Sequence, residues 1–211
     1  MCPKWAITIR EKWKTIMKSK TIAILRGIKT DECESIFATL LDAGIKKIEI
    51  PLNSPDPFTS IKCMIEKYGD KCAIGAGTVT NISEVERLVE CGANFIVSPN
   101  CDKEVIKSAI ANGLEPYPGV FTPTETFNAI KWGARNLKLF PAATLGTDHV
   151  NAIKEVLPEN ANIFAVGGIN AQNIKQWFEA GIHGVGLGSS VYKAGDNAEI
   201  VKVKLSKLFA D

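Results

Sequence analysis

Residues 46–77 read KKIEIPLNSPDPFTSIKCMIEKYGDKCAIGAG and contain one complete strand–helix–strand unit. Residues 46–52 and 72–77 are short, mostly apolar runs, and residues 55–68 between them carry apolar side chains at helical spacing. A helical crossover of this length joins two parallel strands. The segment therefore predicts an α/β protein with a parallel sheet.

The same alternation continues in both directions along the chain. Further strands are predicted at 21–26, 94–98, 114–118, 136–141, 162–166 and 183–187, and further helices at 31–43, 82–91, 102–112, 123–132, 147–157, 171–180 and 197–209. The strands are nearly continuously apolar, as expected where both faces are covered. Eight such units with short loops favour a single-domain (β/α)8 TIM barrel over residues 1–211. A doubly wound open sheet is the alternative.

Residues that end and begin helices support these boundaries. A glycine, which readily adopts the left-handed conformation, closes five helices just before the next strand: Gly44, Gly92, Gly113, Gly133 and Gly181. Polar residues that can cap a helix precede four of these five helices: Thr30, Asn81, Thr122 and Asn170. A barrel predicts that the chemistry lies at the carboxyl ends of the strands.

The composition excludes several classes of protein. Basic and acidic residues number 25 and 23 and are dispersed, so no electrostatic footprint for nucleic acid is expected. The six cysteines form no CxxC pair, no secretory leader precedes them, and no apolar segment is long enough to span a membrane. We expect a cytoplasmic protein with neither a nucleic-acid nor a membrane partner.

Residues 1–20 predict an extra helix before the first strand. Trp5, Ile9, Trp13, Ile16 and Met17 fall on one helical face, with lysines and an arginine around them. Such a helix usually packs on the fold, here covering one end of the core. The alternative is a basic amphipathic helix that lies on an anionic membrane.

Lys138 is the first residue that does not fit a purely structural strand. In residues 136–141, NLKLFP, alternation places Lys138 and Phe140 on one face and the leucines on the other. Because burial disfavours an ammonium ion, a buried lysine has a lowered pKa and a nucleophilic amine. The alternative is a lysine at the barrel rim that reaches water.

Glu49 and Arg26 are charged residues near the carboxyl ends of two other strands. A carboxyl in dry surroundings has a raised pKa and can act as a general acid or base. The alternative for Glu49 is a salt bridge to Arg26 or Lys138. A guanidinium at this end suits a carboxylate or phosphate, although Arg26 could be an ordinary surface arginine.

Glycine-rich turns follow the last two strands, in Gly167-Gly168 and in Gly188-Ser189. Exposed backbone N–H groups, aided by helix N-termini, can bind an anion there, and barrels often hold phosphate at this place. Tight turns without a ligand are the alternative. Histidines occur only at His149 and His183, so no metal site is predicted.

Taken together, these segments resemble the 2-keto-3-deoxy-6-phosphogluconate/4-hydroxy-2-oxoglutarate (KDPG/KHG) aldolase family of class I barrels. The matching segments run in order along the chain: AILRGI (23–28), IEIPLNSP (48–55), YGDKCAIGAGTV (68–79), IVSPN (96–100), LKLFP (137–141), FAVGGI (164–169) and GLGSSVYKAG (186–195). The resemblance implies a cofactor-independent enzyme that cleaves a phosphorylated 2-keto-3-deoxy sugar acid, and a homotrimer.

The resemblance also implies roles for individual positions. Lys138 would form a Schiff base with the substrate, and Glu49 would be the general acid/base, working through a water. The pyruvate end of the substrate would contact Thr78, Pro99 and Phe140, and the phosphate would contact Gly167, Gly168, Gly188 and Ser189.

Three further positions bear on the substrate. The phosphogluconate-type enzymes carry an arginine four residues after the catalytic glutamate, where this chain has Asn53. The phosphogalactonate branch of the family is similar to this chain in having that asparagine, an arginine at position 26 and a valine at position 166. Asn53, Arg26 and Val166 are therefore expected to contact a galactonate-type substrate.

Two other functions remain open at this point. A phosphate-binding barrel isomerase or epimerase would use Lys138 only to stabilise charge. A non-catalytic phosphosugar-binding module would retain the anion site without turnover, although the presence of both Lys138 and Glu49 argues against it.

Overall fold

The computed structural model describes residues 4–210, with side chains from residue 11 onward. Its strands are β1 (Thr21–Ile24), β2 (Lys47–Pro51), β3 (Ala73–Gly77), β4 (Phe95–Val97), β5 (Glu115–Tyr117), β6 (Gly119–Val120), β7 (Asn136–Leu139), β8 (Asn162–Val166) and β9 (Gly184–Leu187). Its helices are α1 (Lys4–Ser19), α2 (Thr30–Asp42), α3 (Pro57–Tyr68), α4 (Ile82–Cys91), α5 (Lys103–Ala111), α6 (Pro123–Lys131), α7 (Ala142–Lys154), α8 (Ile174–Glu179) and α9 (Ala198–Leu208).

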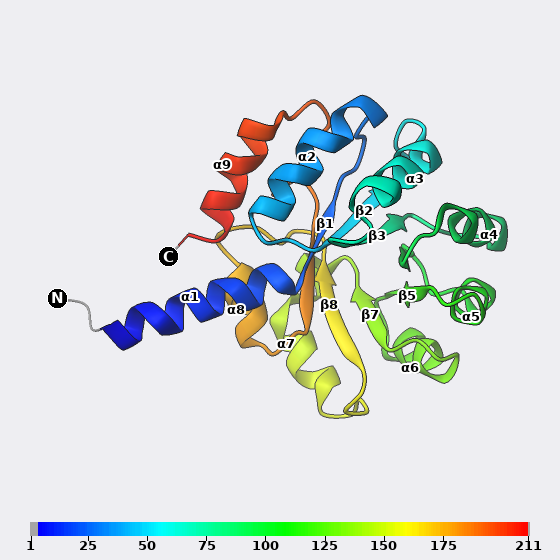
Figure 1. Cartoon of the computed structure of the whole chain (residues 1–211). Coiled ribbons are helices and arrows are strands. Elements are labelled where there is room, and N and C mark those ends of the chain that lie inside the picture. Colours follow the sequence, from blue (N-terminus) through cyan, green and yellow to red (C-terminus); the bar gives the residue numbers. More distant parts are fainter. Residues whose placement is uncertain (1–3, 211) are drawn as a thin grey trace.

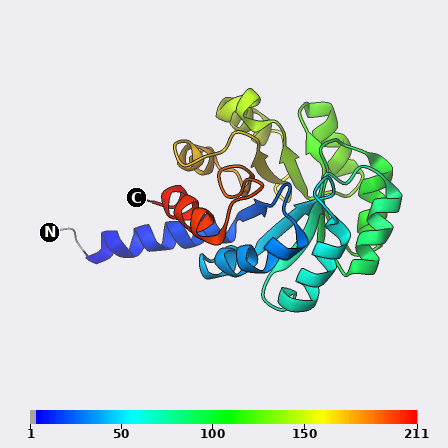
Figure 2. The ribbon, with the colours of Figure 1, turned by 90° about the horizontal axis from the view of Figure 1, so that it is seen from above.

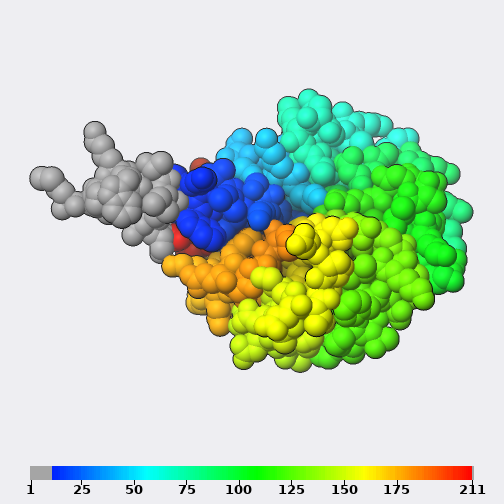
Figure 3. Space-filling view, turned by 90° about the horizontal axis from the view of Figure 1, so that it is seen from below, coloured from blue at the N-terminus to red at the C-terminus, as the bar shows by residue number. Residues whose placement is uncertain are grey.

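The strands form one parallel sheet that closes on itself. Their order is β5-β4-β3-β2-β1-β9-β8-β7-β6, and its two end strands are separated in sequence by Pro118 alone. The Lys138 N–H donates to the Pro118 carbonyl across the closure, at 2.9 Å. Strands occupy the centre and helices surround them (Figures 1 and 2). In the space-filling view the colours follow the chain round the body (Figure 3). The predicted barrel is confirmed, and the open sheet is wrong.

The fifth predicted strand, 114–118, needs a correction. Pro118 has no N–H to donate to a strand ladder, so it interrupts the strand. Before it, β5 pairs with β4, and after it, β6 pairs with β7. One barrel position is therefore filled by two short strands, which together make the closure.

The helix boundaries were predicted with mixed success. All five closing glycines have positive φ, between 77° and 105°. Asn81 and Thr122 cap α4 and α6 through their side chains, but Lys29, not Thr30, is the N-cap residue of α2. The helix expected at 171–180 begins only at Ile174, because Asn170 instead accepts a hydrogen bond from Gln172 N–H within a preceding turn.

The interior of the barrel has its own small core. Ile22, Phe95, Val97 and Tyr117 are buried there, and Phe164 packs against them. The Tyr117 ring meets Phe95 and Phe164 edge-on, with centroids 5.7 and 5.0 Å away. These rings fill the lower half of the barrel, below the carboxyl ends of the strands. A separate and larger apolar cluster joins the outer face of the barrel to the helices.

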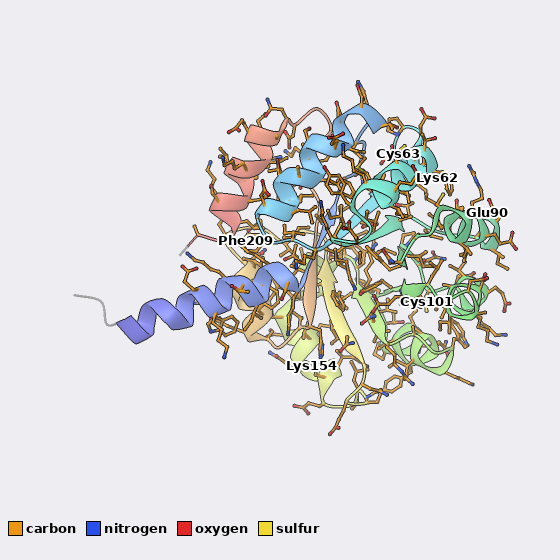
Figure 4. All side chains as sticks on the ribbon, viewed as in Figure 1. Lys62, Cys63, Glu90, Cys101, Lys154 and Phe209 are labelled. Atoms are coloured by element: carbon orange, nitrogen blue, oxygen red, sulfur yellow. The ribbon has the colours of Figure 1, made fainter. Side chains whose placement is uncertain are left out.

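Helix α1 extends away from the barrel (Figures 1 and 2). Met17 packs against the main core, and Lys18 Nζ lies 5.8 Å from the centre of the Phe209 ring (labelled in Figure 4). Trp13, however, is 48% exposed, so among the described side chains of α1 (residues 11–19) the prediction that the helix covers the core is confirmed only near its end, at Met17. The side chains of Trp5 and Ile9 lie outside the described residues. No helix within residues 4–210 is both long enough and apolar enough to cross a bilayer.

Candidate active site

A small cavity inside the barrel brings the two predicted catalytic residues together. Glu49 from β2 and Lys138 from β7 line it with Tyr117, Phe164 and Val166. Strand alternation accounts for this, because every second residue of a barrel strand points inward. The sequence places these two side chains 89 positions apart, and closure of the sheet brings both into one interior.

Lys138 is buried, with 7% of its surface exposed. Burial lowers the pKa of its amine, Glu49 opposes that shift, and Arg26 adds to it. Its Nζ also lies 4.4 Å from the centre of the Phe140 ring, at the upper side of the cavity. The alternative of a lysine that reaches water at the rim is therefore wrong, and the neutral, nucleophilic amine is favoured.

Glu49 is 2% exposed, and its Oε2 is buried without a hydrogen-bond partner within the described residues. Burial raises the pKa of this carboxyl to about 7, against the opposing charges of Lys138 and Arg26. No ion pair within 4.0 Å joins Glu49 to either of them in residues 11–210, so the salt bridge considered for Glu49 is absent there. Such a carboxyl can exchange a proton near neutral pH.

Gly77 leaves the space that the Glu49 carboxylate occupies. A Cβ atom at Gly77 would overlap with Glu49 Oε2, so the side chain lies in the space that this glycine leaves. Gly77 pairs with Pro51 in the neighbouring strand, at the end of β3. Gly77 thus allows β3 to pack closely against the acid/base candidate.

A second lysine, Lys47, also enters the barrel interior, and sequence reasoning missed it. Lys47 Nζ donates to Glu115 Oε2 at 2.8 Å and to the Tyr117 hydroxyl at 2.5 Å. Because its ammonium is held by these two acceptors, Lys47 is a poor nucleophile compared with Lys138. It marks the lower end of the barrel, opposite the expected position of the substrate.

Above the cavity lies a cleft of about 370 Å³ at the carboxyl ends of the strands. It gathers most of the remaining predicted site residues in one lining: Arg26, Phe140, Val166, Gly167, Gly168, Gly188 and Ser189. Ile24, Val166 and Gly186 line both the cleft and the interior cavity, so the two spaces adjoin. A larger cleft of about 580 Å³ between α1, α2 and α9 contains none of the predicted site residues.

The two glycine-rich loops of the cleft are tied to each other. Ser190 Oγ donates to the Ile169 carbonyl at 2.7 Å, and Asn173 Nδ2 donates to the Gly168 carbonyl at 2.9 Å. Within the described residues, the backbone N–H groups of Gly168, Ser189 and Ser190 have no hydrogen-bond partner. Unpaired N–H groups on fixed loops can bind an anion.

One part of the anion prediction is wrong. Helix N-termini were expected to assist, but α8 starts four residues after Asn170 and is only six residues long, and α9 starts at Ala198, well beyond Ser189. Unpaired backbone N–H groups, rather than helix dipoles, are therefore the candidate element for anion binding. Lys193, which sequence reasoning missed although it lies within the quoted segment 186–195, lines the same cleft and adds a positive charge.

Asn53 is not among the residues that line the cleft. It is, however, hydrogen-bonded to Arg26, which does line the cleft. Arg26 Nη1 donates to Asn53 Oδ1 at 2.7 Å. Gly27 N–H donates to Ser54 Oγ at 2.9 Å, which joins the same two loops a second time. Two of the three residues that the resemblance relates to the phosphogalactonate branch, Arg26 and Asn53, are thus hydrogen-bonded to each other.

Thr78 and Pro99 follow β3 and β4 at the same end of the barrel, outside both linings. Thr78 has a positive φ of 61°, which is rare for a β-branched residue and stores local strain. It directly follows Gly77, which contacts Glu49. The predicted contacts of Thr78 and Pro99 with the substrate stay predictions.

The chain is similar to known aldolases over most of its length. The family model of KDPG and KHG aldolases matches residues 13–204. The 2-dehydro-3-deoxy-6-phosphogalactonate aldolase of Escherichia coli strain K12 is 45% identical over 188 residues, which cover 89% of this chain and 91% of the relative. The 2-dehydro-3-deoxy-phosphogluconate aldolase of Pseudoalteromonas atlantica is 30% identical over 157 residues, covering 74% and 71%.

A solved structure gives the same result. The structure described as native KDPGal superposes with a TM-score of 0.87 at 43% identity, and the match covers 89% of this chain and 91% of that one.

Proposed function

Because the chain belongs to the family of KDPG and KHG aldolases, we propose that it cleaves 2-dehydro-3-deoxy-6-phosphogalactonate to pyruvate and D-glyceraldehyde 3-phosphate. The observation that carries the proposal is the shared burial of Lys138 and Glu49 in one cavity, directly below a cleft with unpaired backbone N–H groups. A nucleophilic amine, an acid/base and an anion site are the parts that this reaction needs.

In the proposed mechanism, the neutral amine of Lys138 attacks the C2 ketone to give a carbinolamine. Loss of water leaves an iminium ion, which accepts electrons from the neighbouring bond. Glu49, through a water, removes the proton of the C4 hydroxyl, and the C3–C4 bond breaks to release glyceraldehyde 3-phosphate. The remaining enamine is protonated at C3, and water hydrolyses the imine to release pyruvate. The positioned carboxylate contributes a factor of roughly 10² to 10⁴.

The cleft fits the two ends of this substrate. Phosphate would bind the N–H groups of Gly168, Ser189 and Ser190, with Lys193 as its cation. Thr78, Pro99 and Phe140 would contact the pyruvate end, where Phe140 lies beside the Lys138 amine. Arg26 would bind a carboxylate or hydroxyl through a guanidinium oriented by Asn53.

The choice of the galactonate epimer rests on the Arg26–Asn53 pair and on sequence identity. Identity to the phosphogalactonate aldolase is 45%, against 30% to the phosphogluconate aldolase. An arginine at position 53, as in the phosphogluconate type, would remove the side-chain oxygen that accepts the hydrogen bond of Arg26. Asn53 instead fixes Arg26.

Two further parts of the proposal concern the protein in the cell. We propose a cytoplasmic location, supported by the five described cysteines, all of which are free thiols. We also propose a homotrimer, which rests on the family resemblance. Size-exclusion chromatography with light scattering would give the mass of the assembly, and a monomeric mass would contradict the trimer.

The test is a steady-state assay of pyruvate release from the two C4-epimeric phosphorylated acids. The proposal predicts a higher kcat/KM for the galactonate epimer and loss of turnover in Lys138→Ala. Retained turnover in a natively folded Lys138→Ala protein would exclude the imine mechanism. A higher kcat/KM for the gluconate epimer would keep the chemistry and overturn the choice of substrate.

A further inference from the structure

Five polar residues form a connected cluster at the lower end of the barrel, which we call the barrel floor: Lys47, Glu115, Tyr117, Asn136 and Asn162. The Tyr117 hydroxyl donates to Glu115 Oε2 at 2.9 Å and accepts from Lys47 Nζ. Asn136 Nδ2 donates to Glu115 Oε1 at 2.6 Å, and Asn162 Nδ2 donates to Asn136 Oδ1 at 2.9 Å. The mechanism uses none of these groups.

The barrel floor lies between solvent and the cavity that contains Glu49 and Lys138. The side chains of Lys47 and Glu115 are 26% and 46% exposed, so this ion pair is in contact with solvent. Tyr117 is 1% exposed, and its ring is packed between Phe95 and Phe164. On its other side, Tyr117 lines the cavity that contains Glu49 and Lys138. The Tyr117 ring thus stands between the solvent-exposed end of the barrel and the buried cavity that contains Glu49 and Lys138.

The strands connect the floor rigidly to the reacting groups. Asn136 precedes Lys138 by two residues on β7, and Lys47 precedes Glu49 by two residues on β2. Residues two apart on a strand point to the same side, so each reacting group stands one layer above a floor residue. At the barrel closure, the Lys138 N–H donates to the carbonyl of Pro118, the residue after Tyr117.

We propose that Tyr117 is a positioning residue for Lys138: its hydroxyl, held between Lys47 and Glu115, fixes the ring that keeps water out of the chamber from below. The inference builds on the proposed function, because it concerns the amine that forms the imine. Removing the hydroxyl leaves the ring free to shift and lets water reach Lys138 Nζ. A better-hydrated amine is more easily protonated.

The charges around these groups fix the sign of the expected effect. Lys138 faces Glu49 from β2 and Arg26 from the end of the first barrel strand, and Tyr117 faces Lys47 from β2 and Glu115 from its own strand. Because burial lowers the pKa of Lys138, admission of water raises it toward its ordinary value. The fraction of neutral amine at neutral pH then falls, and the rate of imine formation falls with it.

The experiment measures imine formation by the full chain with pyruvate, trapped by borohydride, from about pH 5 to about pH 10. In Tyr117→Phe the midpoint of the pH–rate profile should shift to a pH about one unit higher. Imine formation at neutral pH should then be roughly tenfold slower. The rate at high pH should match that of the unaltered protein. Tyr68→Phe, a buried tyrosine between helices, is the matched control and should leave the profile unchanged.

A second variant separates positioning from simple charge effects. Removing the negative charge in Glu115→Ala would by itself lower the pKa of Lys138, whereas loosening the floor raises it. The proposal predicts an upward shift of the profile in this variant too. A profile of Tyr117→Phe that superposes on that of the unaltered protein, or a downward shift in Glu115→Ala, would overturn it. If the unaltered protein itself traps no pyruvate, the proposed function fails instead.

Discussion

Arg26 and Asn53 meet at the mouth of the barrel, where the guanidinium of one donates a 2.7 Å hydrogen bond to the side-chain oxygen of the other. Arg26 and Asn53 follow two neighbouring strands. Strand β1 pairs with β2, and in this pairing Ile24 lies beside Glu49. The pair therefore links the residue that lines the cleft to the strand that carries the acid/base candidate. The orientation of Arg26 depends on the side chain at position 53.

The first prediction concerns this pair. In Asn53→Ala the guanidinium loses its partner and becomes mobile, so KM for the phosphogalactonate substrate should rise roughly fivefold, the equivalent of about 1 kcal/mol for one hydrogen bond. The kcat should change less, because Lys138 and Glu49 are untouched. Steady-state kinetics measures both constants. Asn112→Ala is the control, since Asn112 is exposed at the opposite end of the barrel and its side chain donates to the Ser108 carbonyl of its own helix, away from the cleft. Equal KM values in the two variants would argue against the role of Asn53.

The second prediction concerns the phosphate. Lys193 lines the cleft beside the loops with unpaired N–H groups. Because Lys193 is exposed, Lys193→Gln should raise KM for the phosphorylated substrate only about two- to fivefold, and the difference should shrink at high salt. Lys175→Gln, an 85% exposed lysine on α8, should have no effect. An equal loss with an unphosphorylated analogue would show that Lys193 does not recognise the phosphate.

The third prediction concerns stability and pH. Burial raises the pKa of Glu49 to about 7, so the folded protein holds this proton at pH values where the unfolded chain has already lost it. The folded state is favoured below the ordinary value of 4.5, and this advantage is lost as the pH rises through about 7. The glutamine of Glu49→Gln does not titrate, so this variant avoids that loss. From acid to mildly alkaline pH, its free energy of unfolding should therefore rise by roughly 3 kcal/mol relative to that of the unaltered protein.

Urea unfolding at about pH 4.5 and about pH 8 measures this difference. Glu90→Gln, at an exposed position on α4 (labelled in Figure 4), is the control and should follow the unaltered protein at both values. A constant difference between Glu49→Gln and the unaltered protein would mean that folding does not raise the pKa of Glu49. The acid/base role near neutral pH would then lose its support.

Much of the fold was predictable because each unit carries local signals. Apolar strands and positive-φ glycines such as Gly44 and Gly133 depend on nearby residues, and the predicted units all exist. The split at Pro118 could have been predicted, since proline cannot donate in a ladder. The late start of α8 could not, because Asn170 and Asn173 suit a turn and a cap equally well.

The candidate site was predictable where a charge interrupts an apolar strand. Lys138 and Glu49 are such cases, and both are buried. Lys47 and Glu115 escaped notice because each stands at the first residue of its strand, where a charge is usually solvated. Their inward direction depends on how the closed barrel staggers its strands, which no single segment determines. The Arg26–Asn53 contact depends on the pairing of β1 with β2, which neither segment determines alone.

The most direct test of the account is to incubate the protein with pyruvate and borohydride and to map the reduced adduct by peptide mass spectrometry. Lys138 and Lys47 both point into the barrel; burial lowers the pKa of Lys138, whereas Lys47 is held by hydrogen bonds to Glu115 and Tyr117. The account predicts one adduct, on Lys138. An adduct on Lys47, or none from folded protein in excess pyruvate, would contradict it.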